Sequence, residues 1–172
     1  DLARQVEALF GPLVGEPSFH RALEKNIDRR TALCIREADG PPGAALLGGL
    51  LFSPKPLRYT IGWLAVTQSQ RRKGIGQKLV RYVLTLAEAP TEFVVTTFGA
   101  DNPSGEPTRH FYEKLGFYPA EPAASGPEGG SRQNFRLRRI NMVEPINIAQ
   151  KFALFQETWS PKIVGELNDA YV

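Results

Sequence analysis

The sequence predicts an α/β (α+β) domain in which helices flank a mixed central β-sheet, and three observations carry this prediction. Two amphipathic helical patterns are followed by three strand-like runs, an order that favours an antiparallel meander. The middle of the chain then alternates strand, helix, strand, helix and strand, which is typical of parallel strands joined by a helical crossover. With 172 residues, of which 42% are hydrophobic and 23% charged, the chain is long enough for one domain with a core.

The first third of the chain supplies the meander. Residues 2–10 carry apolar side chains at helical spacing, and Ser18 can cap a second helix with Phe19, Leu23 and Ile27 on its apolar side. Strands are predicted at 32–36, 44–52 and 59–66. The second of these is almost wholly apolar, as expected of a strand buried on both faces, and the prolines of segment 53–56 should end it.

The rest of the predicted domain alternates helices with strands. Helices at 75–86 and 107–115 each carry an apolar stripe, and Pro90 and Gly116 are placed to end them. Strands are predicted at 93–98, from 117 onward and at 135–142, with a loop at 121–131. These segments complete a sheet in which some neighbours run parallel and others antiparallel.

Composition excludes several classes of protein. No apolar run approaches the roughly 18 residues of a membrane span, and no segment has the pattern of a signal peptide, so we expect a cytoplasmic protein without a membrane partner. A net charge of +3 is too mild to indicate a nucleic-acid partner. Because Cys34 is the single cysteine and His20 lies far from His110 in sequence, we expect no disulfide framework and no metal.

One segment, residues 66–76 (VTQSQRRKGIG), has the features of an anion-binding loop. It lies between a predicted strand and a predicted helix, whose first N–H groups lack helical partners. Gly74 and Gly76 allow close approach to the backbone, and Arg71 to Lys73 add three positive charges. A solvated basic loop and a nucleic-acid patch are the alternatives. The two common phosphate motifs, GxxxxGK[ST] and GxGxxG, are absent.

Two motifs in this order resemble the GNAT superfamily of N-acetyltransferases. Arg71-x-x-Gly74-x-Gly76 matches the Q/R-x-x-G-x-G/A signature with which that family binds the pyrophosphate of acetyl-CoA. After the next strand, 100–103 (ADNP) and 111–117 (FYEKLGF) are similar to the family's second conserved segment. The resemblance covers roughly residues 1–140 and implies the family's acyl-CoA N-acyltransferase fold.

The resemblance implies acetyl-CoA as co-substrate, no metal, and transfer of its acetyl group to a primary amine by direct attack in a ternary complex. The resemblance places the pantetheine arm against the backbone at the end of the strand that precedes the signature, where the strands splay. It places the diphosphate against the N–H groups of the signature. Asn102 would contact the pantetheine or the incoming amine. The coenzyme-binding residues implied in this way are Leu64, Ala65, Val66, Arg71, Arg72, Lys73, Gly74, Ile75, Gly76 and Asn102.

The resemblance also implies a catalytic role for Tyr112, as the general acid that protonates the departing thiolate. From the residues alone, packing of Phe111 and Tyr112 is the alternative. The strand at 57–66 contains no carboxylate, so the base is expected to be a water, or the amine arrives neutral. The same absence keeps open an acyl-CoA-binding regulatory or structural module without turnover. We expect His110 at the surface and Cys34 in the core.

The two ends and the acceptor are less defined by the sequence. The family normally begins with a strand, whereas this chain opens on a helical pattern, so we expect the first strand to be missing from a domain at 1–142. Residues 143–172 form an extension, and its part 155–172 resembles the opening of small cupins; a packed C-terminal helix is the alternative. The acceptor is expected to be a small-molecule or peptide amine, and a homodimer is an open alternative. Mixed charges on the early helices suggest a solvated face.

Overall fold

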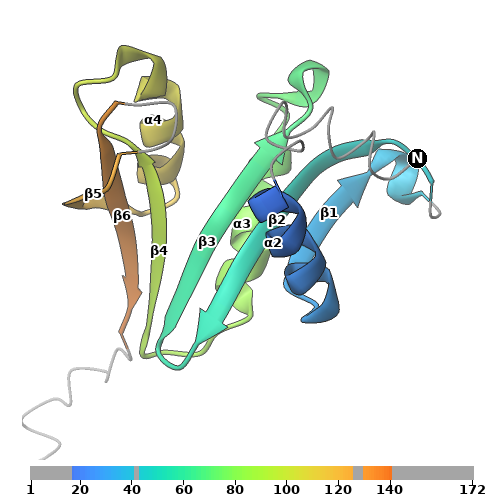
Figure 1. Ribbon diagram of the computed structural model, residues 1–172, viewed down its shortest axis with the longest axis horizontal. Coiled ribbons are helices and arrows are strands. Elements are labelled where there is room, and N and C mark those ends of the chain that lie inside the picture. Colours follow the sequence, from blue (N-terminus) through green and yellow to red (C-terminus); the bar gives the residue numbers. More distant parts are fainter. Residues whose placement is uncertain (1–16, 41–42, 126–129, 141–172) are drawn as a thin grey trace, which may run out of the picture. The chain divides into compact units, whose positions relative to one another are not determined.

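The computed structural model describes residues 17–40, 43–125 and 130–140, which form helices on both sides of a six-stranded sheet (Figure 1). The strands are β1 (Ala32–Arg36), β2 (Leu46–Lys55), β3 (Arg58–Val66), β4 (Thr91–Phe98), β5 (Tyr118–Ala123) and β6 (Arg132–Arg139). The helices are α2 (Pro17–Asp28), α3 (Ile75–Thr85) and α4 (Glu106–Lys114), with short 3-10 turns η2 (Glu37–Asp39), η3 (Gln68–Gln70) and η4 (Pro103–Gly105).

The sheet has the order β1-β2-β3-β4-β6-β5, and its mixed character confirms the predicted fold class. The pairs β1–β2 and β2–β3 are antiparallel and make the predicted meander. The β3–β4 pair is parallel, and α3 is the crossover between its two strands. β6 then pairs antiparallel with β4 on one side and with β5 on the other.

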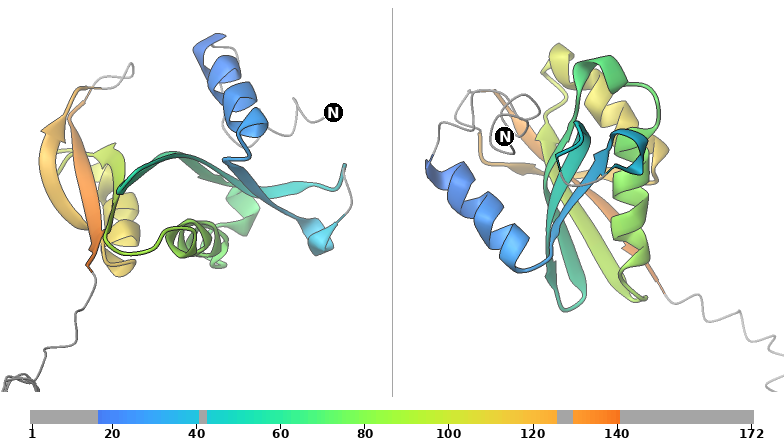
Figure 2. Two further views of the ribbon diagram at one scale, coloured as in Figure 1. Left: turned by 90° about the horizontal axis from the view of Figure 1, so that it is seen from below. Right: turned by 90° about the vertical axis from the view of Figure 1, so that its right-hand side faces the viewer.

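Two helical layers cover opposite faces of the sheet. Figure 2 shows α2 on one face, and α3 and α4 on the other. α2 packs through Phe19, which is 3% exposed and meets the Trp63 ring edge-on at 5.2 Å between ring centres. α2 begins at Pro17, so Ser18 lies inside its first turn, and the prediction that Ser18 caps the helix is wrong.

The main core lies between the sheet and the layer that contains α3 and α4. Phe93 of β4 and Phe135 of β6 are fully buried there, opposite Val80 and Val83 of α3. Gly48 of β2 lets α3 come close, because a β-carbon at Gly48 would stand 2.7 Å from the Ile75 Cγ2. This contact places the first turn of α3 directly on the sheet.

β2 continues to Lys55, so the prediction that segment 53–56 ends this strand is wrong. The Phe52 N–H donates to the Thr31 carbonyl at 3.0 Å, and thus points toward the β1 side. Backbone groups alternate along a strand, so Pro54 also has its nitrogen on that side, beyond the last β1–β2 pair at Ala32 and Leu51. The missing proline N–H therefore removes no hydrogen bond from the sheet.

The end of α4 follows the sequence prediction closely. Gly116 has φ 92°, its N–H donates to Glu113 at 2.9 Å, and the Phe117 N–H donates to Tyr112 at 3.1 Å. This pair of bonds is the Schellman arrangement that ends a helix at a glycine. It turns the chain directly into β5, and the Tyr112 carbonyl accepts from the N–H groups of Leu115 and Phe117.

Other boundaries differ from the predictions or lie outside the described residues. β5 runs to Ala123 and β6 starts at Arg132, so both strands occupy part of the predicted loop 121–131. Cys34 is exposed rather than in the core, because it points away from Leu33 and Ile35, which pack on the core from the other face of β1. The predicted helix at 2–10 and the extension at 143–172, with its cupin-like part, lie outside the described residues.

Candidate coenzyme-binding and catalytic site

β3 and β4 are paired over only part of their length. Their parallel register covers four positions, from Arg58 opposite Glu92 to Ile61 opposite Val95. β3 continues to Val66 and β4 to Phe98, and the two strands diverge over this stretch (Figure 1). The divergence leaves one backbone edge of each strand without a neighbouring strand in the described part of the chain.

A β-bulge in β3 stands at the start of this divergence. Ile61 pairs with Phe52 of β2, but the next pair is Trp63 with Leu51, so Gly62 is the extra residue. The bulge reverses the alternation, and Trp63 therefore faces α2 although Ile61 faces the core. Sequence reasoning missed it, although an isolated glycine inside a strand pattern is a signal for a bulge.

The bulge and the strand pairing decide which backbone groups of β3 face the gap. The Thr67 N–H donates to the Leu47 carbonyl of β2 at 2.9 Å. Since backbone groups alternate in an antiparallel pair, the N–H and carbonyl groups of Ala65 also point toward β2. Those of Leu64 and Val66 point toward the side of β4. Of the three residues predicted to hold the pantetheine arm, the geometry therefore presents Leu64 and Val66 to a ligand in the gap.

The loop after β3 delivers the chain into α3 with open N–H groups. Gly74 precedes the helix in the left-handed region, with φ 81°, and no side chain caps the helix. The Lys78 N–H donates to the Gly74 carbonyl at 2.9 Å, and the N–H groups of the first turn, before Lys78, have no helical partner. A β-carbon at Gly74 would meet no described atom within 4 Å, so the approach to this turn is open.

The three basic side chains of the loop are exposed around this turn. The Arg71 Nε donates to the Val66 carbonyl at 3.3 Å, and the Arg71 N–H donates to Gln68 at the same distance. The Lys73 Nζ donates to the Gln70 side chain at 3.2 Å. Arg72 has φ 63° and extends from the loop. The predicted anion site thus has free N–H groups at Ile75 and Gly76, whereas the Arg71 N–H is already used within the loop.

Phe111 of α4 packs against this turn, and sequence reasoning missed its position. A β-carbon at Gly76 would stand 3.4 Å from the Phe111 ring and 3.5 Å from Val66 Cγ2. The ring therefore covers the junction between the end of β3 and the first turn of α3. It also meets the Tyr112 ring edge-on at 5.0 Å between centres.

Tyr112 is 4% exposed and lies in the main core. Its ring packs between Phe111 and Phe117, and the centres of the Tyr112 and Phe117 rings are 5.5 Å apart. Burial raises the pKa of the Tyr112 hydroxyl above its ordinary value, so the group stays protonated at neutral pH. Among the described residues no hydrogen bond engages this hydroxyl.

This arrangement has counterparts among known proteins. A sequence model of the acetyltransferase (GNAT) domain matches residues 29–119. The chain belongs to the GNAT acetyltransferase family. No curated protein matches it.

Solved structures share the fold of this GNAT acetyltransferase. The NatC complex bound to Gag peptide and CoA is 19% identical and covers 80% of this chain and 90% of its own, with a TM-score of 0.60. A GNAT family acetyltransferase from Bacillus cereus is 17% identical, covers 81% and 92%, and has a TM-score of 0.58. Arabidopsis thaliana Naa50 in complex with a bisubstrate analogue, CoA-Ac-MVNAL, is 17% identical, covers 69% and 80%, and has a TM-score of 0.56.

Two further polar side chains of the GNAT domain lie on η4 and α4. The Asn102 side chain accepts from the Ser104 N–H at 3.1 Å and so caps η4, just after β4. Arg109 lies one turn before Tyr112 on the same side of α4, and its Nε is buried without a hydrogen-bond partner in the described structure. The orphaned Arg109 nitrogen is a group that sequence reasoning did not single out.

Neither β3 nor β4 carries a carboxylate in the stretch where the two strands diverge. Glu92 is the carboxylate in the paired part of these strands, and it contacts Arg58, Arg136 and Arg138. Burial raises the pKa of Glu92, but the hydrogen bonds from these arginines hold the net value below its ordinary range. Glu92 is therefore an ion-pair residue, and not a proton acceptor near neutral pH.

In residues 17–40, 43–125 and 130–140, no group of three or more His, Cys, Asp or Glu side chains could hold a metal ion. None of the helices in these ranges is long and apolar enough to cross a membrane. His110 is exposed, as predicted, with its Nδ1 3.7 Å from a Glu113 oxygen.

Proposed function

We propose that this GNAT domain transfers the acetyl group of acetyl-CoA to a primary amine, by direct attack of the amine on the thioester in a ternary complex. One observation carries the proposal: the edge of β3 at Leu64 and Val66 faces the gap beside β4, and after one short loop the chain reaches a helix terminus at Gly74 without a side-chain cap. An extended amide-containing arm that ends in a diphosphate fits this sequence of groups. The CoA-bound solved structures of the same fold support acetyl-CoA as the co-substrate.

The first part of the reaction is positioning. Backbone groups of Leu64 and Val66 hold the amides of the pantetheine arm between β3 and β4, and the N–H groups of Ile75 and Gly76 hold the diphosphate. Arg72 and Lys73 add positive charge at the same place. Fixing the thioester next to the bound amine supplies the largest share of the rate, because it replaces a bimolecular encounter.

The chemical step then needs two proton movements. The amine nitrogen attacks the carbonyl carbon, the C–S bond breaks, and the thiolate takes the proton of the Tyr112 hydroxyl. The new amide nitrogen releases its extra proton to water, since Glu92 is engaged by arginines and β3 carries no carboxylate. Water then returns one proton to the Tyr112 oxygen, which restores the hydroxyl for the next turnover. Asn102 caps η4 in the loop that follows β4, and we propose that it contacts the pantetheine or the amine. Peptide-bound and peptide-analogue-bound neighbours support a peptide among the acceptors.

The function is tested by acetyl-CoA binding and by release of free thiol with a panel of amines, amino acids and peptides. We expect binding, and thiol release that depends on the amine. The variant Gly74→Ala should weaken acetyl-CoA binding, because φ 81° disfavours a side chain and the strain falls on the turn proposed to hold the diphosphate. Gly43→Ala is the matched control: Gly43 has φ 101° and equally open surroundings, but precedes β2 rather than α3.

A second candidate is an acyl-CoA-binding module without turnover, which the absence of a carboxylate from β3 favours. Tight acetyl-CoA binding without thiol release across the whole panel would support this candidate. No binding of acetyl-CoA, or equal binding by Gly74→Ala, would contradict both. The cytoplasmic location and the homodimer stay predictions.

A further inference from the structure

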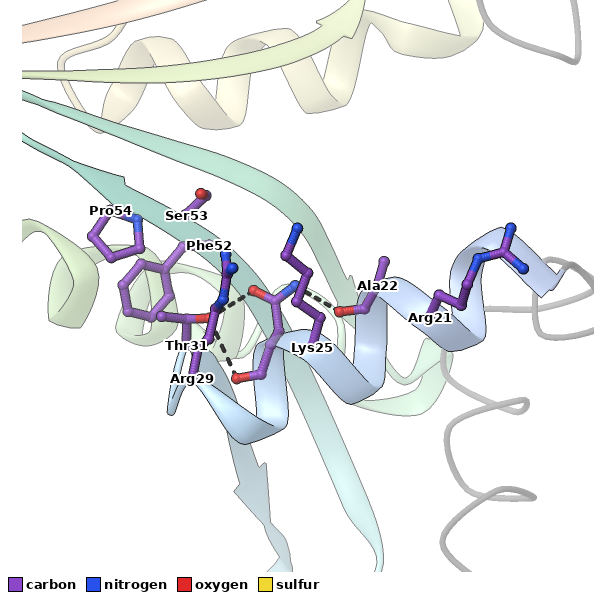
Figure 3. Close-up of a pocket in the computed structure, with 9 residues that line it drawn as sticks. Arg21, Ala22, Lys25, Arg29, Thr31, Phe52, Ser53 and Pro54 are labelled. Carbon is purple, nitrogen blue, oxygen red and sulfur yellow. Dashed lines mark hydrogen bonds between the residues drawn. The ribbon is translucent and has the colours of Figure 1, made fainter.

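A second feature of the fold is a pocket of about 650 Å³ between α2 and β2 (Figure 3). Since α2 covers the face of the sheet opposite α3 (Figure 2), this pocket is separate from the turn proposed to hold the coenzyme's diphosphate. Its basic lining comes from Arg21, Lys25 and Arg29 on α2, and its floor includes Ser53 and Pro54 of β2.

The three basic side chains stand four residues apart and therefore line one side of α2. Among the described residues, no carboxylate lines this pocket and no ion pair joins Arg21, Lys25 or Arg29 to an acidic group. Like charges at this spacing disfavour a helix. The dipole of α2 offsets this cost for Lys25 and Arg29 near its C-terminal end, but it does not supply the missing anion.

A second basic cluster in the same domain shows what such cations do when an anion is present. Arg58, Arg136 and Arg138 converge on Glu92, with nitrogen–oxygen distances of 2.9, 2.5 and 3.1 Å. That cluster is neutralised from within the chain. The described lining of the α2 pocket contains no such carboxylate, so no described acidic side chain neutralises its positive charge.

The pocket is held in shape by hydrogen bonds among its neutral polar groups. The Asn26 side chain donates to the Ala22 carbonyl and accepts from the Thr31 hydroxyl, each at 2.7 Å. The Thr31 carbonyl in turn accepts from the Phe52 N–H at 3.0 Å, which fastens the end of α2 to β2. The wall is thus preformed, and the groups it leaves for a ligand are the cationic ones.

The pocket is close to the proposed reaction centre. Ser53 pairs with Thr60 and Phe52 pairs with Ile61, which is the last β3 residue paired with β4. With about 4.8 Å between neighbouring strands, the pocket floor lies roughly 10 Å from the start of the divergence. A single acceptor of moderate length can therefore place its amine at the thioester and a second group in the pocket.

We propose that this pocket binds an oxyanion, a carboxylate or a phosphate, of the acceptor, so that the acceptor is an amine bearing negative charge about 10 Å from its reactive nitrogen. The acceptor role rests on the proposed acetyltransferase function. The binding of an anion in the α2 pocket does not, and it is measured separately.

The test uses the full chain with two synthetic peptides that have free amino termini, one with glutamates after the first residue and one with glutamines in their place. We expect the acidic peptide to have a KM about tenfold lower than the glutamine peptide, with the same kcat. Lys25→Gln and Arg29→Gln should each raise the KM for the acidic peptide about tenfold, and leave that for the glutamine peptide and the affinity for acetyl-CoA unchanged. Arg81→Gln, which removes an exposed cation from α3, is the matched control and should change none of these values.

Direct binding by calorimetry separates the pocket from the reaction. Wild type should bind the acidic peptide more tightly than Lys25→Gln does, even if thiol release is not observed with any amine. Inorganic phosphate is the second probe: tighter binding of phosphate than of the acidic peptide, lost in Lys25→Gln, assigns the pocket to a phosphorylated acceptor. Equal KM and equal binding for the two peptides, with no effect of phosphate, would overturn the proposal, as would an unchanged Lys25→Gln variant.

Discussion

The ring of Phe111 in α4 lies against Gly76 in the first turn of α3, where a β-carbon would stand 3.4 Å from the ring. The same β-carbon would be 3.5 Å from Val66 at the end of β3. The successive elements β3 and α3 therefore meet the more distant α4 at one glycine. The junction lies between the backbone proposed to hold the pantetheine arm and the turn proposed to hold the diphosphate.

This contact predicts graded effects of substitution at Gly76. Gly76→Ala should be tolerated, because 3.4 Å is an ordinary contact, whereas the branched side chain of Gly76→Val must displace Phe111 or Val66. Such overpacking costs about 1–3 kcal/mol. We expect a clearly lower midpoint of thermal unfolding for Gly76→Val, and weaker acetyl-CoA binding measured by calorimetry. The double variant Gly76→Val/Phe111→Ala should lose less stability than the sum of the losses in the two single variants. Losses that simply add would contradict the contact.

A second glycine, Gly48, controls how α3 sits on the sheet. A β-carbon at Gly48 would stand 2.7 Å from Ile75 Cγ2 and 3.2 Å from the Ala65 carbonyl oxygen. Gly48→Ala should therefore destabilise the fold by about 1–3 kcal/mol, measured by urea unfolding. Because α3 moves with Ile75, acetyl-CoA binding should weaken too.

Gly62→Ala is the matched control for stability. Its nearest neighbour would be the Leu51 carbonyl oxygen at 3.7 Å, so the added methyl has room. A Gly62→Ala variant as destabilised as Gly48→Ala would show that loss of backbone freedom in a strand, and not the contact with Ile75, explains both effects.

These contacts mark where prediction from the sequence succeeded and where it stopped. Periodicity located β1 at its observed bounds and α3 to within a residue, since both carry a regular apolar pattern. Pro54 misled the prediction for β2, because a proline is compatible with a strand when its nitrogen faces an open edge. Whether that edge is open depends on the length of β1, which only pairing reveals.

The candidate site was predictable in its motif and not in its geometry. The glycines and basic residues of 71–76 identify a turn before a helix, and the structure has that turn. Strand pairing decides that the backbone groups of Leu64 and Val66, and not those of Ala65, face the gap beside β4. The contact of Phe111 with Gly76 joins residues that are distant in sequence. The mixed charges of the early helices suggested a solvated face. The structure shows that Arg21, Lys25 and Arg29, four residues apart on α2, line the same pocket.

Tyr112→Phe tests the proposed general acid. The substitution removes a hydroxyl that no described residue bonds, so the fold should keep its stability while kcat falls about 10²-fold or more. Acetyl-CoA affinity should not change, because the ring remains in place. Equal kcat for Tyr112→Phe and wild type, measured by thiol release with saturating substrates, would assign Tyr112 to packing alone.

The pH dependence of the same variant gives a second test. Burial raises the folded-state pKa of Tyr112 above its ordinary value of about 10, so the hydroxyl remains a proton donor throughout the neutral and mildly alkaline range. We therefore expect no alkaline loss of kcat from this group below about pH 10. An alkaline limb between pH 8 and 9 that disappears in Tyr112→Phe would contradict the raised pKa.

Glu92→Gln tests the ion-pair cluster on the sheet. Burial raises the pKa of Glu92, but hydrogen bonds from Arg136, Arg138 and Arg58 lower it by more than burial raises it. The folded-state pKa therefore lies below the unfolded one. A lowered carboxyl pKa stabilises the fold above the unfolded pKa, and this stabilisation is lost as the pH falls through the folded value. Glu92→Gln should cost about 1–3 kcal/mol at pH 7, measured by urea unfolding.

The difference between wild type and Glu92→Gln should shrink as the pH falls below about 4.3, because protonation then removes the same charge from wild type. Glu121→Gln is the matched control on the same cluster. Hydrogen bonds, first of all from Arg136, lower the pKa of Glu121 to about 2, but this carboxylate is solvent-exposed and water replaces its partners readily. Glu121→Gln should therefore have the smaller effect at pH 7, and an equal loss for both variants would place the stabilisation in Arg136 rather than in Glu92.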